Sequence, residues 1–408
     1  MRNTVLLVVL AGMAGCADAS PAPQWTTSTR TSGDTTIVRT SRVRDSDAAM
    51  DVREGLRIGA ADNAEEYLFG EVTRIAPGPD GSVYVWDEQA NVLRLYDSGG
   101  RHVRTIGRPG RGPGEYGGSN GLAAMREYVA LWDADNGRVN VYDTSGIFIN
   151  SWPVPRNVGY IDGGLVFDTT GNLYVRQPLG DGDGYLRVRV EDGAVLDTLR
   201  FPQLGPPTPQ LRAIGTAPGI RTMRQVPVPF FPGPMIRLSP AGDVVSGTGK
   251  AYAVTRFHPD GTLLRIERDV EPVPVAEGER RALEDAITSQ MRKLNPAWRW
   301  DVARIPQSRP FFIDLVVASD GAVWVRRSLP PEERVGIASN AALPLRAHDQ
   351  NLPPTYDVFD ANGTFRGRVV LPASAKVLAI RNSEVWTTLT DDLGVPYVVR
   401  FDVRPREP

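Results

Sequence analysis

The sequence predicts an all-β fold, because one strand pattern returns along the whole chain. In its clearest copy, residues 79–106, three alternating apolar runs are separated by turns that contain glycine, which is typical of antiparallel strands in a meander. A sheet unit that recurs at this length indicates a β-propeller. The second run of the unit occurs six times, which predicts six blades of four antiparallel strands; the copies are 81–87, 128–133, 171–176, 242–246, 321–326 and 383–388.

The four strands of a blade are labelled a to d, from the axis to the rim. The sixth copy lacks strand d, because the chain ends soon after Phe401. Thr35–Thr40 is a spare β-type run ahead of the first copy. Propellers commonly close their ring by pairing the first and last segments, so we expect Thr35–Thr40 to complete blade six. The alternative is an edge strand or a disordered segment. The predicted propeller spans residues 35–408, a single domain despite the length of the chain.

The first residues predict export. Arg2 precedes a short apolar run, residues 5–11, that is too short to span a membrane, which is typical of a signal peptide over residues 1–16. Met13-Ala14-Gly15-Cys16 resembles the lipobox of bacterial lipoproteins, which implies that Cys16 is acylated and anchors the protein in a membrane. Ala17 after the cysteine resembles an outer-membrane address in a Gram-negative bacterium, facing the periplasm or the exterior. The alternative is an ordinary secretory signal.

Residues 17–34 are rich in serine, threonine and proline and predict a flexible tether. Cys16 is the one cysteine of the chain, so neither an intrachain disulfide nor a catalytic thiol is expected. The formal net charge is −2, and no motif indicates nucleic-acid binding.

Three long connections are expected on one face of the disc, the face that carries the b–c and d–a connections. These are Pro202–Gly233, Glu271–Pro310 and Arg327–Thr355. The second contains a helical pattern, residues 276–294, with acidic residues early and basic residues late. Long loops in compact domains are often functional. We therefore expect this face, called the insertion face below, to rim or cap the central channel.

Arginine and tryptophan side chains on this face are the candidate ligand contacts. The charged residues that end strand b are acidic in blades one and two and basic in blades three and five, and residues 198–242 contain arginine but no acid. Guanidinium groups favour carboxylate, phosphate or sulfate partners. The binding candidates are Arg176, Arg326, Arg327, Arg221, Arg224, Trp298 and Trp300. The alternative is that the arginines are solvated or paired internally. The strand-b aromatics Tyr84, Tyr174, Trp324 and Trp386 are expected to pack between blades.

A glycine-rich loop, residues 107–116, joins blade one to blade two. It matches neither a phosphate-binding loop nor a dinucleotide fingerprint, so we interpret it as a tight crossover from rim to axis. Its Gly-Arg-Pro-Gly-Arg-Gly-Pro-Gly-Glu-Tyr phrase, after an Asp-Gly-Ser-Val-Tyr-Val blade, resembles the six-bladed propellers of the NHL/TolB-like class found in bacterial lipoproteins. The resemblance covers about residues 35–405 and implies fold and compartment more than activity.

Enzymatic relatives of that class suggest two metal chemistries. A zinc site of three histidines is not expected, because the three histidines of the chain fall on different parts of the strand map. Gluconolactonase-like propellers bind a divalent cation through axial oxygen ligands. The positions that could supply such a site, with calcium as one possible ion, are Glu71, Asp87, Asp133, Asp162 and Asp314. The alternative role for each aspartate is a hydrogen-bonding residue at a turn or strand end.

Together these patterns favour a lipid-anchored binding or scaffolding protein that uses its insertion face and needs no cofactor. The expected ligand is a protein, an anionic small molecule or a glycan. The alternative is a divalent-cation-dependent hydrolase or lyase of the gluconolactonase type.

Overall fold

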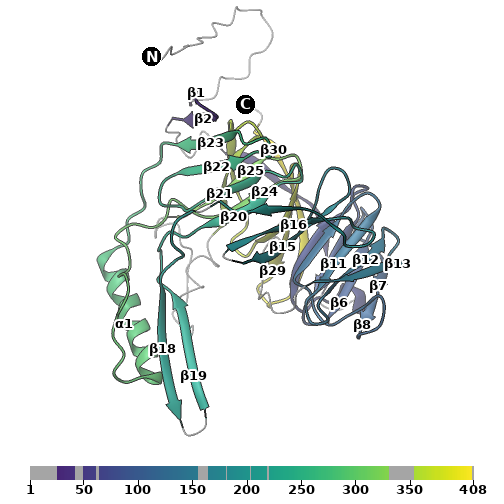
Figure 1. Ribbon diagram of the computed structural model, residues 1–408, viewed down its shortest axis with the longest axis horizontal. Coiled ribbons are helices and arrows are strands. Elements are labelled where there is room, and N and C mark those ends of the chain that lie inside the picture. Colours follow the sequence, from purple (N-terminus) through teal and green to yellow (C-terminus); the bar gives the residue numbers. More distant parts are fainter. Residues whose placement is uncertain are drawn as a thin grey trace, which may run out of the picture.

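The computed structural model describes residues 25–41, 49–60, 64–154, 164–180, 182–202, 204–217, 220–329 and 353–406. Its sheets are arranged as the blades of a six-bladed β-propeller (Figure 1). Each of the first five blades supplies its four innermost strands in chain order, a to d. The bounds are β4 (Val72–Pro77), β5 (Val83–Asp87), β6 (Val92–Tyr96) and β7 (His102–Ile106) in blade one; β10 (Gly121–Ala124), β11 (Tyr128–Asp133), β12 (Arg138–Asp143) and β13 (Phe148–Pro153) in blade two; and β14 (Leu165–Phe167), β15 (Leu173–Leu179), β16 (Gly182–Val188) and β17 (Val195–Arg200) in blade three.

The second half of the ring is built the same way. Blade four contains β20 (Met235–Leu238), β21 (Val244–Gly247), β22 (Ala253–Phe257) and β23 (Leu263–Arg268), and blade five contains β24 (Phe312–Val317), β25 (Val323–Arg327), β26 (Thr355–Phe359) and β27 (Phe365–Val370). Blade six has β28 (Lys376–Arg381), β29 (Glu384–Thr390) and β30 (Pro396–Pro405) as its inner three strands. The repeat in the sequence therefore gave the correct number and order of blades.

The strand that closes the ring is not the one expected. β3 (Met50–Ile58) pairs antiparallel with β30, from Met50 opposite Pro405 to Ile58 opposite Val398, and completes blade six. The assignment of Thr35–Thr40 to this position is wrong. Those residues form β2, which pairs in parallel with β23 at the rim of blade four, from Thr35 opposite Leu263 to Thr40 opposite Arg268.

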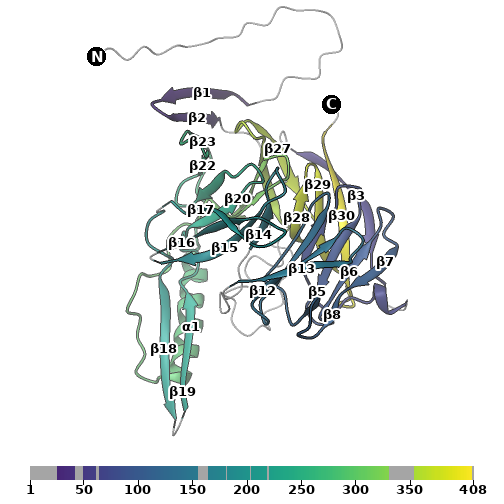
Figure 2. The same cartoon turned by 45° about the vertical axis from the view of Figure 1, so that its right-hand side comes forward.

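β1 (Thr27–Ser32) pairs antiparallel with β2, so blade four carries an additional rim hairpin (Figure 2). The tether expected over residues 17–34 therefore does not extend through Thr27–Ser32, and its first part, residues 17–24, lies outside the described residues. Trp25 anchors the start of the hairpin by an edge contact with Phe365 of blade five, at 5.2 Å between ring centroids.

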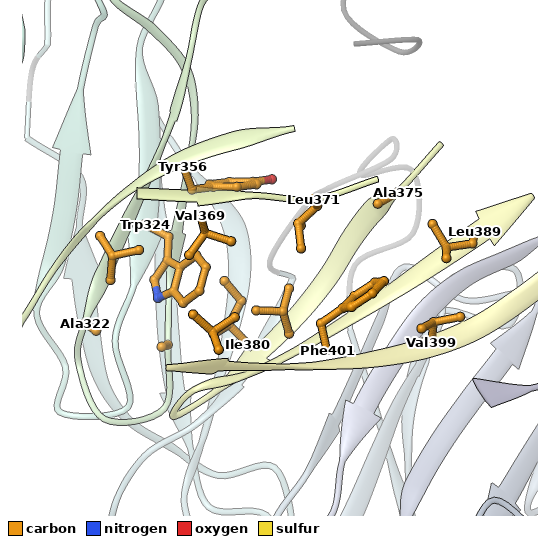
Figure 3. Close-up of a cluster of buried hydrophobic side chains, with 14 residues drawn as sticks. Ala322, Trp324, Tyr356, Val369, Leu371, Ala375, Ile380, Leu389, Val399 and Phe401 are labelled. Carbon is orange, nitrogen blue, oxygen red and sulfur yellow. The ribbon is translucent and has the colours of Figure 1, made fainter. Parts of the chain in front are cut away.

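Apolar side chains hold adjacent blades together, as the strand-b aromatics predicted. Trp324 of blade five and Phe401 of blade six belong to one buried cluster, and Figure 3 shows Trp324 and Val369 facing Ile380 across the blade boundary. Tyr84 and Trp386 are likewise buried in clusters that join neighbouring blades, and Tyr174 is partly buried between blades three and four. The same repeat position thus serves the same packing role around the ring.

Two of the long connections fold together into an arm instead of capping the channel. β18 (Gln210–Ala217) and β19 (Ile220–Pro227) form an antiparallel hairpin, and α1 (Glu277–Leu294) packs against it. Figures 1 and 2 show this arm projecting from the disc on the side opposite the β1–β2 hairpin. The helix has the predicted apolar stripe, with Leu283, Ile287 and Met291 buried in the core of the arm. Most of the third connection, residues 330–352, lies outside the described residues.

The role of β3 leads to a prediction about truncated proteins. Removal of residues 1–41 deletes the rim hairpin but keeps β3, whereas removal of residues 1–59 also deletes β3 and exposes the edge of β30. We expect the shorter truncation to retain a cooperative thermal transition at a modestly lower temperature. The longer truncation should lose that transition or yield aggregated protein, as measured by circular dichroism and light scattering. Equal behaviour of the two truncations would contradict ring closure by β3.

Candidate functional site

The innermost strands of all six blades surround one axial cavity. Its volume is about 910 Å³, and its lining includes residues of β4, β10, β14, β20, β24 and β28. None of the described residues of Pro202–Gly233 or Glu271–Pro310 lines it. The expectation that these two connections rim or cap the channel is therefore wrong, because their apolar side chains are buried against each other in the arm.

The charged lining of the cavity is mainly basic. Among the described residues it contains one acid, Asp314, and five cations, which are Arg74, Arg237, Arg326, Lys376 and Arg381. Thr388, Thr390, Tyr185 and Tyr356 add hydroxyl groups. A cavity of this size with a few convergent polar groups is typical of a small-molecule site, and its excess of positive charge favours an anion.

Strand direction places most of these groups at the insertion-face end of the cavity. Each strand a begins on that face, and Lys376 is the first residue of β28. In β4 and β24 a register irregularity at Thr73 and Ile313 precedes Arg74 and Asp314. Bulges of this kind redirect the side chains that follow them. Arg381 lies at the opposite end, where its guanidinium donates to the carbonyl oxygens of Gly78 and Pro79.

An ion pair crosses between two blades inside the cavity. Arg237 of β20 donates from Nη2 to Asp314 Oδ1 of β24 at 2.7 Å, and Asp314 Oδ1 also accepts the backbone N–H of Leu315 at 2.7 Å. Arg326 lies opposite Asp314 in the β24–β25 register and lines the same cavity. Asp314, the one acid of the described lining, is thus held by its neighbours, and the described lining residues have five cations against this one acid.

Arg327, the next residue, belongs to a different site. It lies 3.9 Å from Asp357, which is fully buried and also pairs with Arg268 and with Arg368 at 3.1 Å. The hydroxyl of Tyr252 donates to the same carboxylate at 2.6 Å. Burial acts to raise the pKa of Asp357, but the three guanidinium groups and the tyrosine hydroxyl hold that pKa below its usual value. This cluster joins blades four and five and explains the position of Arg327 structurally.

The other arginine candidates are dispersed. Arg176 lies in β15, 3.5 Å from Asp183, with its guanidinium over the ring of Phe201. Arg224 lies on the arm and donates to Gln290 Oε1 at 2.8 Å. Arg221 is in β19, and its side chain lies outside the described residues. Of the arginines predicted as ligand contacts, Arg326 is the one described at the cavity.

The two tryptophans belong to the core of the arm. Trp298 is 5% exposed, and its indole N–H donates to the carbonyl of Arg212 at 2.8 Å. Trp300 is partly buried against the same core and donates to Thr288 Oγ1 at 3.0 Å. Both side chains therefore stabilise the arm in this structure and do not face the cavity.

The described acidic residues that were considered for a divalent cation do not gather their carboxylates in one site. Asp87 is buried and accepts four backbone N–H groups at the end of β5, from Gly70, Glu71, Gln89 and Ala90. Asp133 has the equivalent role at the end of β11, where it accepts from Gly117 and Asn136. Glu71 is exposed, and Asp162 lies outside the described residues. Within the described part of the chain, no group of three or more histidine, cysteine or acidic side chains is placed to hold a metal ion.

The glycine-rich loop is a structural crossover. Its short strands β8 (Arg108–Pro109) and β9 (Glu115–Tyr116) pair in parallel, and Glu115 accepts the backbone N–H of Gly112 at 2.7 Å. Arg138 of blade two donates to the loop carbonyls of Arg111, Gly112 and Glu115. These contacts fix the backbone of the loop at the boundary between blade one and blade two.

Sequence reasoning missed four cavity residues, Arg74, Arg237, Lys376 and Arg381, and it missed the β18–β19 hairpin. The strand-a repeat positions could have identified the cavity residues, since strand a lies at the axis. The Pro218-Gly219 pair between two alternating runs was a turn signal for the hairpin.

Comparisons with known proteins agree with this architecture. A family described as "6-bladed beta-propeller" matches residues 61–172. The protein is a six-bladed β-propeller. A solved member of the DUF4221 family from Bacteroides vulgatus is 9% identical, with a TM-score of 0.54, and the match covers 90% of this chain and 100% of that chain. Such a likeness supports the fold alone.

Two further solved structures are less similar. A protein from Bacteroides fragilis that is named as exported is 13% identical, with a TM-score of 0.49, over 91% of this chain and 99% of that chain. Virginiamycin B lyase from Staphylococcus aureus is 10% identical, with a TM-score of 0.39, and the match covers 87% of this chain and 99% of that chain. No curated protein matches the sequence. Among the described helices, none has the length and apolar character needed to span a membrane.

The buried cluster around Asp357 leads to a stability prediction. Asp357→Asn removes the carboxylate that pairs with three arginines, and breaking a buried ion pair costs about 3–5 kcal/mol. We expect a loss of this order in urea unfolding at pH 7. The control Glu277→Gln, which removes an exposed partner of Arg281, should change stability by less than about 1 kcal/mol.

The difference in stability between the parent protein and Asp357→Asn has a predictable pH dependence. Because the folded pKa of Asp357 is below the unfolded value of about 3.9, its stabilising contribution is complete above that pH and is lost as the pH falls through the folded pKa. The stability difference between the parent protein and Asp357→Asn should therefore be constant above about pH 4 and shrink below it. A difference that changes between pH 5 and pH 8 would contradict this assignment.

Proposed function

We propose that this protein is a membrane-anchored binding protein whose axial cavity takes an anionic small molecule or a charged end of a glycan from the insertion face. The observation that carries the proposal is the cavity lining, with its five cations and one internally paired acid. Guanidinium groups and a lysine at the mouth would hold carboxylate, phosphate or sulfate oxygens, and the threonine and tyrosine hydroxyls would orient the rest of the ligand.

The contacts of Asp314, the acid at the cavity, favour binding over metal-dependent hydrolysis. A lactonase-type reaction would need convergent oxygen ligands for a divalent cation. Asp314 instead accepts from Arg237 and from a backbone N–H, and no second described acid lines the cavity with it. The described lining of the axial cavity thus has mainly cationic side chains, whereas a metal-dependent enzyme of that type would have acidic metal ligands there.

The anchor rests on Cys16 and its preceding Met13-Ala14-Gly15. The distance from Cys16 to Trp25 is nine residues, which span at most roughly 30 Å when extended. An acylated Cys16 would therefore hold the β1–β2 hairpin near the membrane, with the arm pointing away from it. The anchor and the cavity would then act together by presenting a binding site at a membrane surface.

Citrate binding tests the cavity. We expect Arg326→Gln combined with Lys376→Gln to weaken the binding of citrate, measured by isothermal titration calorimetry, by about tenfold or more, because two charged hydrogen bonds are lost. The matched control Arg104→Gln with Arg126→Gln removes two exposed cations outside the cavity and should leave binding unchanged. Equal loss of citrate binding in both double variants would show that the effect comes from the overall charge of the protein and would contradict binding in the cavity. Unchanged citrate binding in the cavity variant would also overturn the proposal.

Acylation of Cys16 is tested separately. In a Gram-negative host, Cys16→Ser should move the protein from the detergent-soluble membrane fraction to the soluble fraction or to an uncleaved precursor. Ser20→Ala, in the same segment, should leave the membrane fraction unchanged. Identical partition and processing of Cys16→Ser and the parent protein would show that the cysteine is not the anchor.

A further inference from the structure

The two edges of the arm hairpin differ. The edge of β18 is covered, since the carbonyl of Arg212 accepts the indole N–H of Trp298. The opposite edge, that of β19, borders a groove of about 460 Å³. This groove is lined by Thr222, Met223, Arg224 and Gln225 of β19 and by Gln290, Lys293 and Leu294 of α1.

The register shows which backbone groups of β19 point into solvent. Val228 donates its N–H to the carbonyl of Pro209 at 2.9 Å, so these two residues form a hydrogen-bonded pair of the antiparallel ladder. Hydrogen-bonded and non-hydrogen-bonded pairs alternate along such a ladder. Met223 opposite Ile214 and Gln225 opposite Arg212 are therefore non-hydrogen-bonded pairs. Consequently, the N–H and C=O groups of Met223 and Gln225 point away from β18.

This edge has the features of a strand-docking site. Proline is absent from β19 before its last residue, Pro227, and prolines or inward-pointing charges are common devices that block an exposed edge. Met223 is 60% exposed. Among the described residues, no backbone hydrogen bond outside the hairpin engages the outward backbone groups of Met223 or Gln225. An extended segment could therefore add a third strand to the hairpin.

The charges of the groove specify the occupant. Its two ionisable lining residues, Arg224 and Lys293, are both cations, and Arg292 is exposed in the last turn of α1. A second copy of this chain would bring like charges together at the same edge, which is unfavourable. Successive side chains of a strand point to opposite faces, and Arg224 faces α1 whereas Met223 faces solvent. An acidic segment would therefore pair its carboxylates with Arg224 and Lys293 on the α1 face, while its apolar side chains contact Met223 on the other face.

We propose that the edge of β19 binds an extended, acidic segment of a partner protein, which pairs with the backbone of Met223 and Gln225 and is held beside α1 by Arg224 and Lys293. This site is separate from the axial cavity and does not depend on the function proposed there. On the arm, which points away from the anchored end, it would let the propeller contact a partner at a distance from the membrane.

The probe is a fluorescent peptide of alternating glutamate and valine, Glu-Val-Glu-Val-Glu-Val-Glu, titrated by anisotropy against the full protein. Met223→Pro removes one outward N–H without breaking a bond to β18, and it should weaken binding by about tenfold or more. Arg224→Glu with Lys293→Glu should do the same through charge. Arg104→Glu with Arg126→Glu, at exposed positions of the disc, is the control and should bind as the parent does.

Two further measurements separate strand addition from simple charge attraction. The same peptide with alternate backbone nitrogens methylated should lose most of its affinity. Amide-resolved hydrogen exchange should show Met223 and Gln225 becoming protected on peptide binding, whereas the amide of Arg224, already paired with β18, should change little.

The proposal is overturned if the acidic peptide fails to bind at millimolar concentration, or if the methylated peptide binds equally well. It is also overturned if Met223→Pro abolishes a concentration-dependent dimer of the free protein, since the occupant would then be a second copy. Circular dichroism melting of each variant distinguishes loss of the site from loss of the fold, and Arg224→Glu with Lys293→Glu tests the site independently of any backbone change.

Discussion

Closure of the ring is the constraint on which the other features depend. A blade is stable when both of its faces are covered by neighbours, and in a circle this requires every blade to be complete. β3 and β30 meet this requirement by joining residues from opposite ends of the chain, with Met50 opposite Pro405 and Ile58 opposite Val398. Without this pairing, blade six would present the bare edge of β30 at the rim of the ring.

The repeat made the blades predictable, because it reports local alternation and turn chemistry. The same information misplaced the closing strand. Thr35–Thr40 has the composition of a strand, whereas Met50–Ile58 contains four charged residues and a glycine, and its side chains are mostly exposed or half-buried. A rim strand has one face toward solvent and needs little apolar character. The choice between the two candidates depends on a non-local pairing, which composition does not reveal.

The site shows the same division between local and non-local information. Arg326 and Arg327 are adjacent in β25, yet successive side chains of a strand point to opposite faces. One therefore lines the cavity, and the other joins the cluster around Asp357. Asp87, Asp133 and Asp314 looked alike as carboxylates near strand ends, but only the last has an arginine from another blade as its partner in the cavity. Residue type predicted the available chemistry, and only the assembled ring determined where each group acts.

The arm adds a second level of organisation, because its core is separate from the cores between blades. Leu211, Ile287 and Trp298 pack within the arm, while the base of the arm is fixed by Arg309, whose guanidinium binds both carboxylate oxygens of Glu279 and lies over the ring of Phe230. A buried charged clamp of this kind specifies one orientation more strictly than apolar contact does, since its hydrogen bonds are lost on a small rotation. The disc can therefore keep the cavity at its axis while the arm carries a separate surface in a defined direction. This separation would let substitutions at the edge of β19 alter the proposed partner binding without disturbing the blades, and substitutions in the cavity alter the proposed ligand binding without disturbing the arm.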